Sequence, residues 1–176
     1  RVMIFGESHG ESVGLCIDGC PAGLPVSVDD FFDDIERRKG GKQKGTTPRQ
    51  EEDLPIFKSG IFNGHTTGAP ITIIFENKNT RSGDYDKLRS IPRPGHADFV
   101  AHHKFGGYED YRGGGHFSGR LTLCLVAAGV IAKKLLQPTN ITARITEIGG
   151  EADLEKGLQK AIDAKDSVGG IVECTV

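Results

Sequence analysis

Residues 6–10, GESHG, place a serine and a histidine side by side between two glycines. The pattern formally matches the G-x-S-x-G nucleophile elbow of serine hydrolases, in which a sharp turn presents the serine hydroxyl above a sheet. An elbow needs a helix directly after the serine, whereas residues 13–18 have an extended, strand-like pattern. This context disfavours a serine hydrolase. A glycine turn in which Ser8 and His9 only satisfy backbone groups stays open on these residues alone.

Residues 93–98, RPGHAD, form a second polar loop, in which His96 stands between an arginine and a carboxylate. A histidine beside a fixed arginine and carboxylate can have its pKa tuned toward neutrality, as proton transfer requires. Metal binding is the alternative, but no HExxH spacing is present, and a lone loop histidine more often hydrogen-bonds or transfers protons. We expect no metal here. The sequence leaves open whether Asp98 reaches His96.

Residues 112–120, RGGGHFSGR, place three glycines directly before an apolar run. Free backbone N–H groups at a helix start attract anions, and glycine lets a ligand approach the backbone closely. A P-loop is excluded because Arg120 and Leu121 stand where Walker A needs lysine and then serine or threonine. A Rossmann loop is excluded because Ser118 replaces its third glycine and no apolar strand precedes it. The segment predicts another kind of anion-contacting loop, with a plain glycine hinge as the alternative.

Residues 37–49 are a basic segment that contains six basic residues and no acidic ones. The six are Arg37, Arg38, Lys39, Lys42, Lys44 and Arg49. Nucleic acid is one candidate partner, but the segment lacks the interleaved aromatic residues of a stacking platform. A small phosphorylated ligand fits the segment at least as well as nucleic acid does, and a non-enzymatic anion-binding module remains the alternative.

Length and composition are those of one globular domain with a real core, and we expect residues 1–176 to form it. The chain has neither a signal peptide nor a run that we identify as membrane-spanning, so we expect no membrane. The cysteines show no CxxC pairing, which predicts reduced core thiols in a cytoplasmic protein. They are Cys16, Cys20, Cys124 and Cys174. We also expect the complete protein to extend beyond both ends of this sequence.

Hydrophobic periodicity predicts an α+β order of elements. Strands are expected at 1–5, 13–18, 71–76, 141–148 and 168–176. Helices are expected at 27–39, 96–105, 121–137 and 152–164. Ser27 is the expected cap of the first helix, and the glycines at 106 and 107 should end the second. The helix at 121–137 is apolar on most sides, which predicts a central, buried position.

The motifs GESHG, the basic RR segment, TTGAPI, RSGDY, RPGHAD, DYRGGG and DSVGG occur together in this order. Their order and spacing resemble the chorismate synthase family over nearly the whole chain. The resemblance implies the N-terminal half of a lyase that removes phosphate and a ring hydrogen from 5-enolpyruvylshikimate 3-phosphate by anti-1,4 elimination. This is the last step of the shikimate pathway, and it needs reduced FMN although no net redox change occurs.

The resemblance also implies roles for particular residues. As the catalytic pair, His9 would lie near the leaving phosphate and His96 near the reduced flavin ring. The residues that match substrate-binding positions are Ser8, Arg38, Lys44, Arg49 and Arg120. Those that match flavin-binding positions are Arg38, Lys44, Arg112, Gly115, His116, Phe117 and Ser118. NADPH as flavin reductant would also contact Arg38 and Lys44.

Two departures from the family pattern bear on these roles. Lys44 stands where arginine is expected, so a point charge replaces bidentate recognition. His116 and Phe117 stand where the commoner form has arginine and serine, so an arginine contact is lost and Phe117 can offer a flat apolar surface instead. For the whole protein the resemblance implies a β-α-β sandwich with central helices between antiparallel sheets, incomplete here, and a homotetramer that binds no nucleic acid.

Overall fold

The computed structural model describes residues 1–40, 49–79, 85 and 91–176. The chain divides into two compact units. The first contains Arg1–Lys39 and Arg49–Ala132, and the described part of the second is mainly Lys133–Val176. The expectation that residues 1–176 form a single domain stays a prediction.

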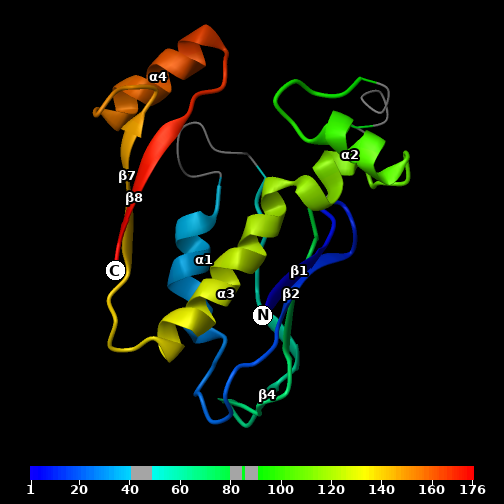
Figure 1. The fold of residues 1–176 in the computed structure, drawn as a ribbon, viewed down its shortest axis with the longest axis vertical. Coiled ribbons are helices and arrows are strands. Elements are labelled where there is room, and N and C mark those ends of the chain that lie inside the picture. The colour runs from blue at the N-terminus through cyan, green and yellow to red at the C-terminus, as the bar shows by residue number, and fades with distance from the viewer. Residues whose placement is uncertain (41–48, 80–84, 86–90) are drawn as a thin grey trace. The chain divides into compact units, whose positions relative to one another are not determined.

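A four-stranded antiparallel sheet is the base of the first unit (Figure 1). Its strands are β1 (Val2–Gly6), β2 (Ser12–Ile17), β6 (Ile71–Glu76) and β3 (Ile56–Ser59), in the order β1-β2-β6-β3. Alternate residues of the two central strands are buried, as a sheet with one covered face requires. The apolar residues that recur at every second position of these strands therefore mark the face of the sheet that packs against the core.

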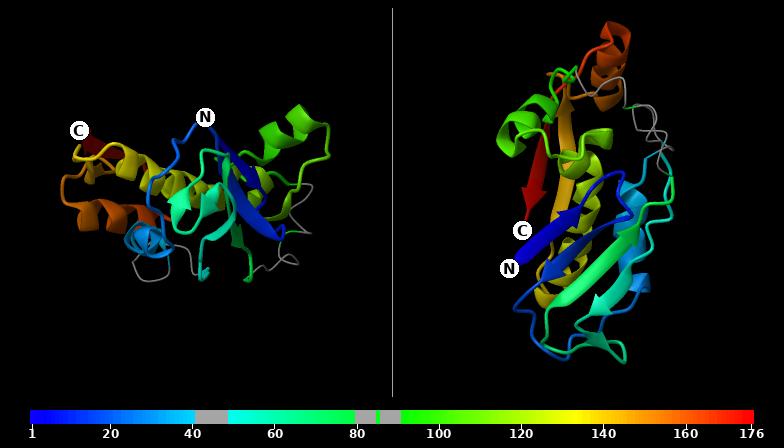
Figure 2. Two further views of the ribbon diagram at one scale, coloured as in Figure 1. Left: turned by 90° about the horizontal axis from the view of Figure 1, so that it is seen from below. Right: turned by 90° about the vertical axis from the view of Figure 1, so that its right-hand side faces the viewer.

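Two helices cover one face of this sheet (Figure 2). They are α1 (Phe32–Arg38), which follows a 3₁₀ turn at Asp29–Phe31, and α3 (Thr122–Leu135), which follows a 3₁₀ turn at Gly119–Leu121. Their inward side chains join those of the sheet in one core. The fully buried large side chains are Val13, Leu15, Phe31, Ile71, Ile73, Phe75, Leu123, Cys124 and Ile131.

Shorter elements complete the first unit. A hairpin pairs β4 (Ile61–Phe62) with β5 (His65–Thr66), and Asn63 and Gly64 form its turn with positive φ angles of 47° and 71°. The helix α2 (Asp98–Phe105) ends where Gly106 adopts a left-handed conformation. A 3₁₀ segment at Arg112–Phe117 then leads toward α3.

In the second unit, β7 (Thr142–Ile148) pairs antiparallel with β8 (Gly170–Thr175). The helix α4 (Leu154–Ala164) packs against β7, and the Asp153 side chain caps it by accepting a hydrogen bond from the Lys156 N–H. The predicted order of strand, helix and strand is confirmed, as is the α+β class with antiparallel sheets.

Several local predictions were wrong. Ser27 does not cap α1: the N-cap residues are Val28 for the 3₁₀ turn and Phe31 for the helix, and neither makes a side-chain cap hydrogen bond within the described part of the chain. The Ser27 N–H instead donates to the Asp30 carboxylate at 2.7 Å. The strands β3, β4 and β5 were not predicted, because two- and four-residue strands are too short to show a period. The thiol of Cys174 is exposed rather than in the core, while Cys20 and Cys124 are buried, and all four thiols are free.

No membrane-spanning run is expected from the sequence, but one segment of the structure is long and apolar enough to be a candidate. By length and composition alone, Arg112–Leu135 would pass as a membrane-spanning helix, a test that core helices of soluble proteins also pass. The α3 part of this segment has five buried residues, Leu123, Cys124, Ala127, Val130 and Ile131, and all five belong to the core of the first unit.

Candidate active site

The two candidate histidines pack against two consecutive glycines of the glycine loop, His9 against Gly113 and His96 against Gly114. Gly113 and Gly114 have φ angles of 59° and 83°. A Cβ on Gly113 would stand 2.3 Å from Cε1 of His9, and one on Gly114 would stand 3.0 Å from Cε1 of His96. Only glycine fits at both places, because the backbone is left-handed and the imidazoles occupy the space of a side chain. Gly113 and Gly114 are therefore a cradle for the histidines, and the simple hinge alternative is set aside.

His9 is enclosed by aromatic and cationic neighbours. The ring of Tyr85 meets the imidazole edge-on, with 5.0 Å between ring centroids and 74° between planes. Burial lowers the pKa of His9 below 6.5, and the nearby cations of Arg49 and Arg112 lower it further. Its Nδ1 is buried and has no hydrogen-bond partner among the residues that the structure describes. The imidazole is thus kept neutral, with a ring nitrogen free to take up a proton.

Ser8 is committed to holding the loop together. It is 2% exposed; its N–H donates to the Gly115 carbonyl at 3.1 Å, and its Oγ accepts from Nη1 of Arg49 at 3.0 Å. His116 adds a second link, with Nδ1 at 3.2 Å from the Gly6 carbonyl. Strand β2, and not a helix, follows this loop, so the serine hydrolase alternative is wrong.

Arg93 and Asp98 fix the position of His96. Arg93 donates to the Asp98 carboxylate from Nε at 2.8 Å, from Nη2 at 2.9 Å and from its backbone N–H at 3.1 Å. This bidentate contact holds the pKa of Asp98 down to about 2. Nδ1 of His96 lies 3.5 Å from Oδ1 of Asp98, which settles the question that the sequence left open. The exposed imidazole therefore rests on a fixed ion pair.

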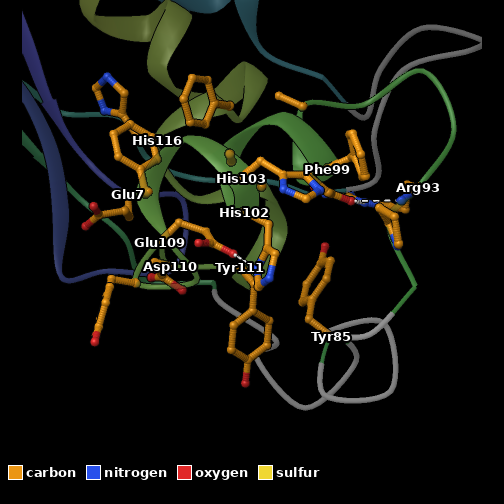
Figure 3. A pocket seen from close by; sticks show the side chains of 18 residues that line it. Glu7, Tyr85, Arg93, Phe99, His102, His103, Glu109, Asp110, Tyr111 and His116 are labelled. Atoms are coloured by element: carbon orange, nitrogen blue, oxygen red, sulfur yellow. Dashed lines mark hydrogen bonds and ion pairs between the residues drawn. The ribbon is translucent and has the colours of Figure 1, made fainter.

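A cavity of about 740 Å³ opens beside the glycine loop and α2 (Figure 3). Aromatic rings make up much of its wall: Tyr85, Phe99, Phe105, Tyr108, Tyr111 and Phe117. Two of its carboxylates pair with arginines, Asp98 with Arg93 and Asp110 with Arg112. A third, Glu109, has Oε1 3.1 Å from Nδ1 of His102. The cavity is therefore mainly an apolar, ring-lined space within the first unit.

The cavity suits the ring system of a flavin. Its volume lies within the range of roughly 300–1,000 Å³ that is usual for small-molecule sites, and flat aromatic walls suit a planar ligand. His116 and Phe117 line it, and Phe117 lies 6.0 Å from Phe105 between ring centroids. Of the other predicted flavin contacts, Ser118 caps the turn before α3, and the Arg112 guanidinium pairs with Asp110.

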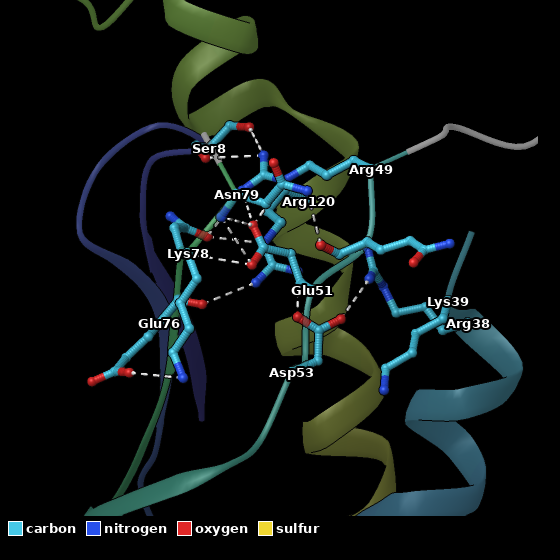
Figure 4. Close-up of polar contacts among 12 residues, drawn as sticks. Ser8, Arg38, Lys39, Arg49, Glu51, Asp53, Glu76, Lys78, Asn79 and Arg120 are labelled. Atoms are coloured by element: carbon cyan, nitrogen blue, oxygen red, sulfur yellow. Dashed lines mark hydrogen bonds and ion pairs between the residues drawn. The ribbon is translucent and has the colours of Figure 1, made fainter. Parts of the chain in front are cut away.

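A separate group of three arginines shares two buried carboxylates (Figure 4). Nε and Nη2 of Arg49 donate to Oε1 of Glu51 at 3.0 and 2.7 Å. Nη1 of Arg120 donates to Oδ1 of Asp53, and Nη1 of Arg38 lies 3.6 Å from Oδ2 of the same carboxylate. We call these five side chains the arginine cluster. It joins the histidine loop through the contact of Arg49 with Ser8.

Within this cluster, Arg120 is turned into the protein. It is 7% exposed, and besides Asp53 its guanidinium donates to the Asn77 side chain at 3.0 Å and the Glu76 carbonyl at 3.5 Å. Arg38 and Arg49 lie nearer the surface, with side chains 21% and 20% exposed. Lys44, predicted to contact both substrate and cofactor, lies outside the described residues.

Sequence reasoning missed the acidic members of the arginine cluster. Glu51 and Asp53 follow the basic segment directly, in the run EED at residues 51–53. That juxtaposition of acidic and basic runs was the available signal. This signal could not identify Arg120 as the partner of Asp53, because Arg120 lies 67 residues further along the chain.

The fold and these side chains define the chain as an α+β protein whose candidate active site is built from loops around a glycine cradle. The family model described as chorismate synthase matches residues 1–176, so the chain belongs to the chorismate synthase family. The chain spans about half the length of the curated relatives that it matches.

Individual relatives agree with this assignment. A chorismate synthase of Chitinophaga pinensis is 71% identical over 177 residues, which cover 100% of this chain and 53% of that protein. One of Dehalococcoides mccartyi is 42% identical over 203 residues, covering 99% of this chain and 56% of that protein. A solved structure described as a crystal structure of chorismate synthase matches with a TM-score of 0.69 at 22% identity, over 99% of this chain and 57% of that one. This last likeness concerns the fold alone.

Proposed function

We propose that the protein to which this chain belongs eliminates phosphate and a ring hydrogen from 5-enolpyruvylshikimate 3-phosphate to give chorismate, with reduced FMN required. The observation that carries the proposal is the placement of His9 and His96 against adjacent glycines. Arg49 and Arg112 lie near His9, and Gly114, against which His96 lies, lines the aromatic cavity. Membership of the family supports the choice of substrate.

The arginines and His9 would act on the departing phosphate. Arg38 and Arg49 offer guanidinium groups, which bind phosphate oxygens with charge-assisted hydrogen bonds. His9 is neutral before the substrate arrives, because burial and neighbouring cations lower its pKa. A phosphate dianion nearby raises that pKa, so His9 can take up a proton and share it with a phosphate oxygen as the carbon–oxygen bond breaks.

The ring-lined cavity would hold the flavin, and Gly114, His116 and Phe117 are among the residues that line it. Reduced FMN supplies electron density to the substrate ring when it is bound. The contribution of this chain's own residues is to exclude water with aromatic side chains and to keep His96 in place on the Arg93–Asp98 pair. His96 then lies against Gly114, a residue that lines the cavity, where its imidazole can hold a proton.

A turnover assay of the complete protein tests the proposal. Under anaerobic conditions with reduced FMN, phosphate and chorismate should form in equal amounts from 5-enolpyruvylshikimate 3-phosphate. Equal turnover with flavin omitted would exclude this function. His9→Ala and His96→Ala should each lower turnover by about a hundredfold to ten-thousandfold, the usual range for acid–base groups. His65→Ala, at an exposed histidine in the β4–β5 hairpin, is the matched control and should leave turnover unchanged.

Three further parts of the proposal concern the complete protein. Arg38 and Lys44 would contact NADPH if the enzyme reduces its own flavin, and the assembly would be a cytoplasmic homotetramer. Stopped-flow measurement of flavin reduction by NADPH tests the NADPH contact. The mass of the assembly, measured by light scattering, tests the homotetramer.

A further inference from the structure

We infer that Asp53 is a positioning residue that aims the Arg38 guanidinium at the anionic substrate, an inference that rests on the proposed function. Asp53 is 4% exposed, and its backbone has a φ angle of 54°. Burial is costly for an aspartate unless the surrounding structure uses its charge, because burial disfavours the ionised form. The positive φ is uncommon for a residue other than glycine, although aspartate and asparagine tolerate it better than most. The two carboxylate oxygens of Asp53 contact two different arginines, and these contacts indicate its role.

One oxygen of Asp53 is fixed by Arg120. Nη1 of Arg120 donates to Oδ1, and Nε of Arg120 donates to the Asn77 side chain at 3.0 Å. With its side chain 5% exposed, Arg120 is held by protein acceptors on more than one side. It therefore serves as an anchor that prevents the Asp53 carboxylate from turning (Figure 4).

The other oxygen of Asp53 faces Arg38. Nη1 of Arg38 lies 3.6 Å from Oδ2, and Nη2 donates to the Gly119 carbonyl at 3.2 Å and to Oγ1 of Thr122 at 3.4 Å. These three contacts hold one edge of the guanidinium. Its Nε is buried and has no hydrogen-bond partner among the residues described by the structure. Arg38 is thus oriented, but its hydrogen-bonding capacity is not used up.

The charges of the arginine cluster leave room for an anion. Three guanidinium groups, those of Arg38, Arg49 and Arg120, face two carboxylates, those of Glu51 and Asp53. Among these five groups one positive charge is in excess. A phosphate or carboxylate group of the substrate would balance it, and Arg38 is the cluster's arginine with the longest ion pair to a protein carboxylate.

Replacing Asp53 distinguishes positioning from simple charge balance, because the two roles predict opposite signs. If Asp53 only offsets positive charge, Asp53→Asn leaves the cluster more cationic and should lower KM for the phosphorylated substrate. If Asp53 aims Arg38, the same variant should raise KM by about tenfold or more, the effect of one lost charge-assisted contact. Asparagine is the suitable replacement because it tolerates a positive φ better than most residues.

The experiment uses the complete enzyme with reduced FMN, and it measures kcat, KM and the binding of inorganic phosphate by calorimetry. Asp53→Asn should raise KM and weaken phosphate binding by similar factors while changing kcat less. Glu52→Gln, the same charge change at an exposed neighbour that pairs with Lys78 on the surface, should change neither. In an Arg38→Ala background, Asp53→Asn should have no further effect on KM, because the residue through which it acts is gone.

Three results would overturn the inference: an unchanged or lowered KM in Asp53→Asn, an equal effect of Glu52→Gln, or a full effect of Asp53→Asn without Arg38. If Asp53→Asn does not fold, Asp53→Glu decides, because it keeps the charge but moves the carboxylate by one methylene. Positioning predicts a raised KM for that variant, and charge balance predicts no change. Failure of the proposed function is recognised separately, as absent turnover in the wild-type enzyme, and phosphate binding would still test Asp53 in that case.

Discussion

The imidazole of His9 lies against Gly113 so closely that a Cβ on the glycine would stand 2.3 Å from Cε1 and 2.4 Å from Nδ1. The same Cβ would stand 3.1 Å from Oγ of Ser8. Two motifs that are far apart in the sequence, GESHG and RGGG, therefore form one surface. The glycine is needed for contact with the histidine as well as for its left-handed backbone.

Gly113→Ala should consequently damage both stability and turnover. A left-handed conformation costs a non-glycine residue roughly 1–2 kcal/mol, and the collision with His9 adds to that. We expect a lower midpoint of thermal unfolding and a large loss of turnover, because the imidazole must move. Gly119→Ala is the matched control, since a Cβ there meets nothing within 4 Å and the φ angle is not left-handed. Equal effects of the two substitutions would contradict the cradle.

His9 should titrate below pH 6.5 in the free protein, because burial and the cations of Arg49 and Arg112 lower its pKa. Since the unfolded chain then binds more protons than the folded one, the contribution of His9 to stability is present above pH 6.5 and is lost as pH falls through its folded pKa. A phosphorylated ligand should raise this pKa. Histidine NMR titrations with and without inorganic phosphate measure both shifts, and an upward shift in the free protein would contradict the prediction.

Asp98→Asn should lower turnover without abolishing flavin binding. The neutral amide cannot form the bidentate ion pair with Arg93, whose donation holds the pKa of Asp98 at about 2. Arg93 would then be free to move, and His96 would lose its fixed neighbour. Turnover and flavin affinity should be measured together. Glu173→Gln, at the exposed pair with Arg144 between β7 and β8, is the control and should leave both unchanged.

Phe117→Ala should weaken the binding of FMN by about two- to tenfold, since an aromatic pair contributes roughly 0.5–1.5 kcal/mol beyond the area that it buries. The ring lines the cavity and lies near Phe105. Phe62→Ala provides the comparison, because Phe62 is 69% exposed in the β4–β5 hairpin and does not line the cavity. Flavin fluorescence quenching gives both affinities. Unaltered affinity in Phe117→Ala would place the flavin elsewhere.

Much of the fold could be predicted because its signals are local. The alternation of buried and half-buried residues along β2 and β6 marks strands, and the apolar α3 marks a core helix. Ser27 shows the limit of such signals. A serine before a helical pattern predicts a cap, but the Asp30 carboxylate accepts from the Ser27 backbone instead, and a 3₁₀ turn begins the helix.

The candidate site shows the same division between local and distant information. The sequence by itself determined which segments carry chemistry, because GESHG, RPGHAD and RGGG each combine glycine with groups that titrate or bind anions. It also determined the family, since the order of motifs along a chain is a property of the sequence. The tertiary structure alone decided that His9 and His96 rest on adjacent glycines and that Arg120 points inward to Asp53. The physical reason is that burial, pKa and the direction of a side chain depend on neighbours from other parts of the chain. Asp53 and Arg120 are 67 residues apart and Arg38 and Gly119 are 81 apart, and such neighbours meet only when the core forms.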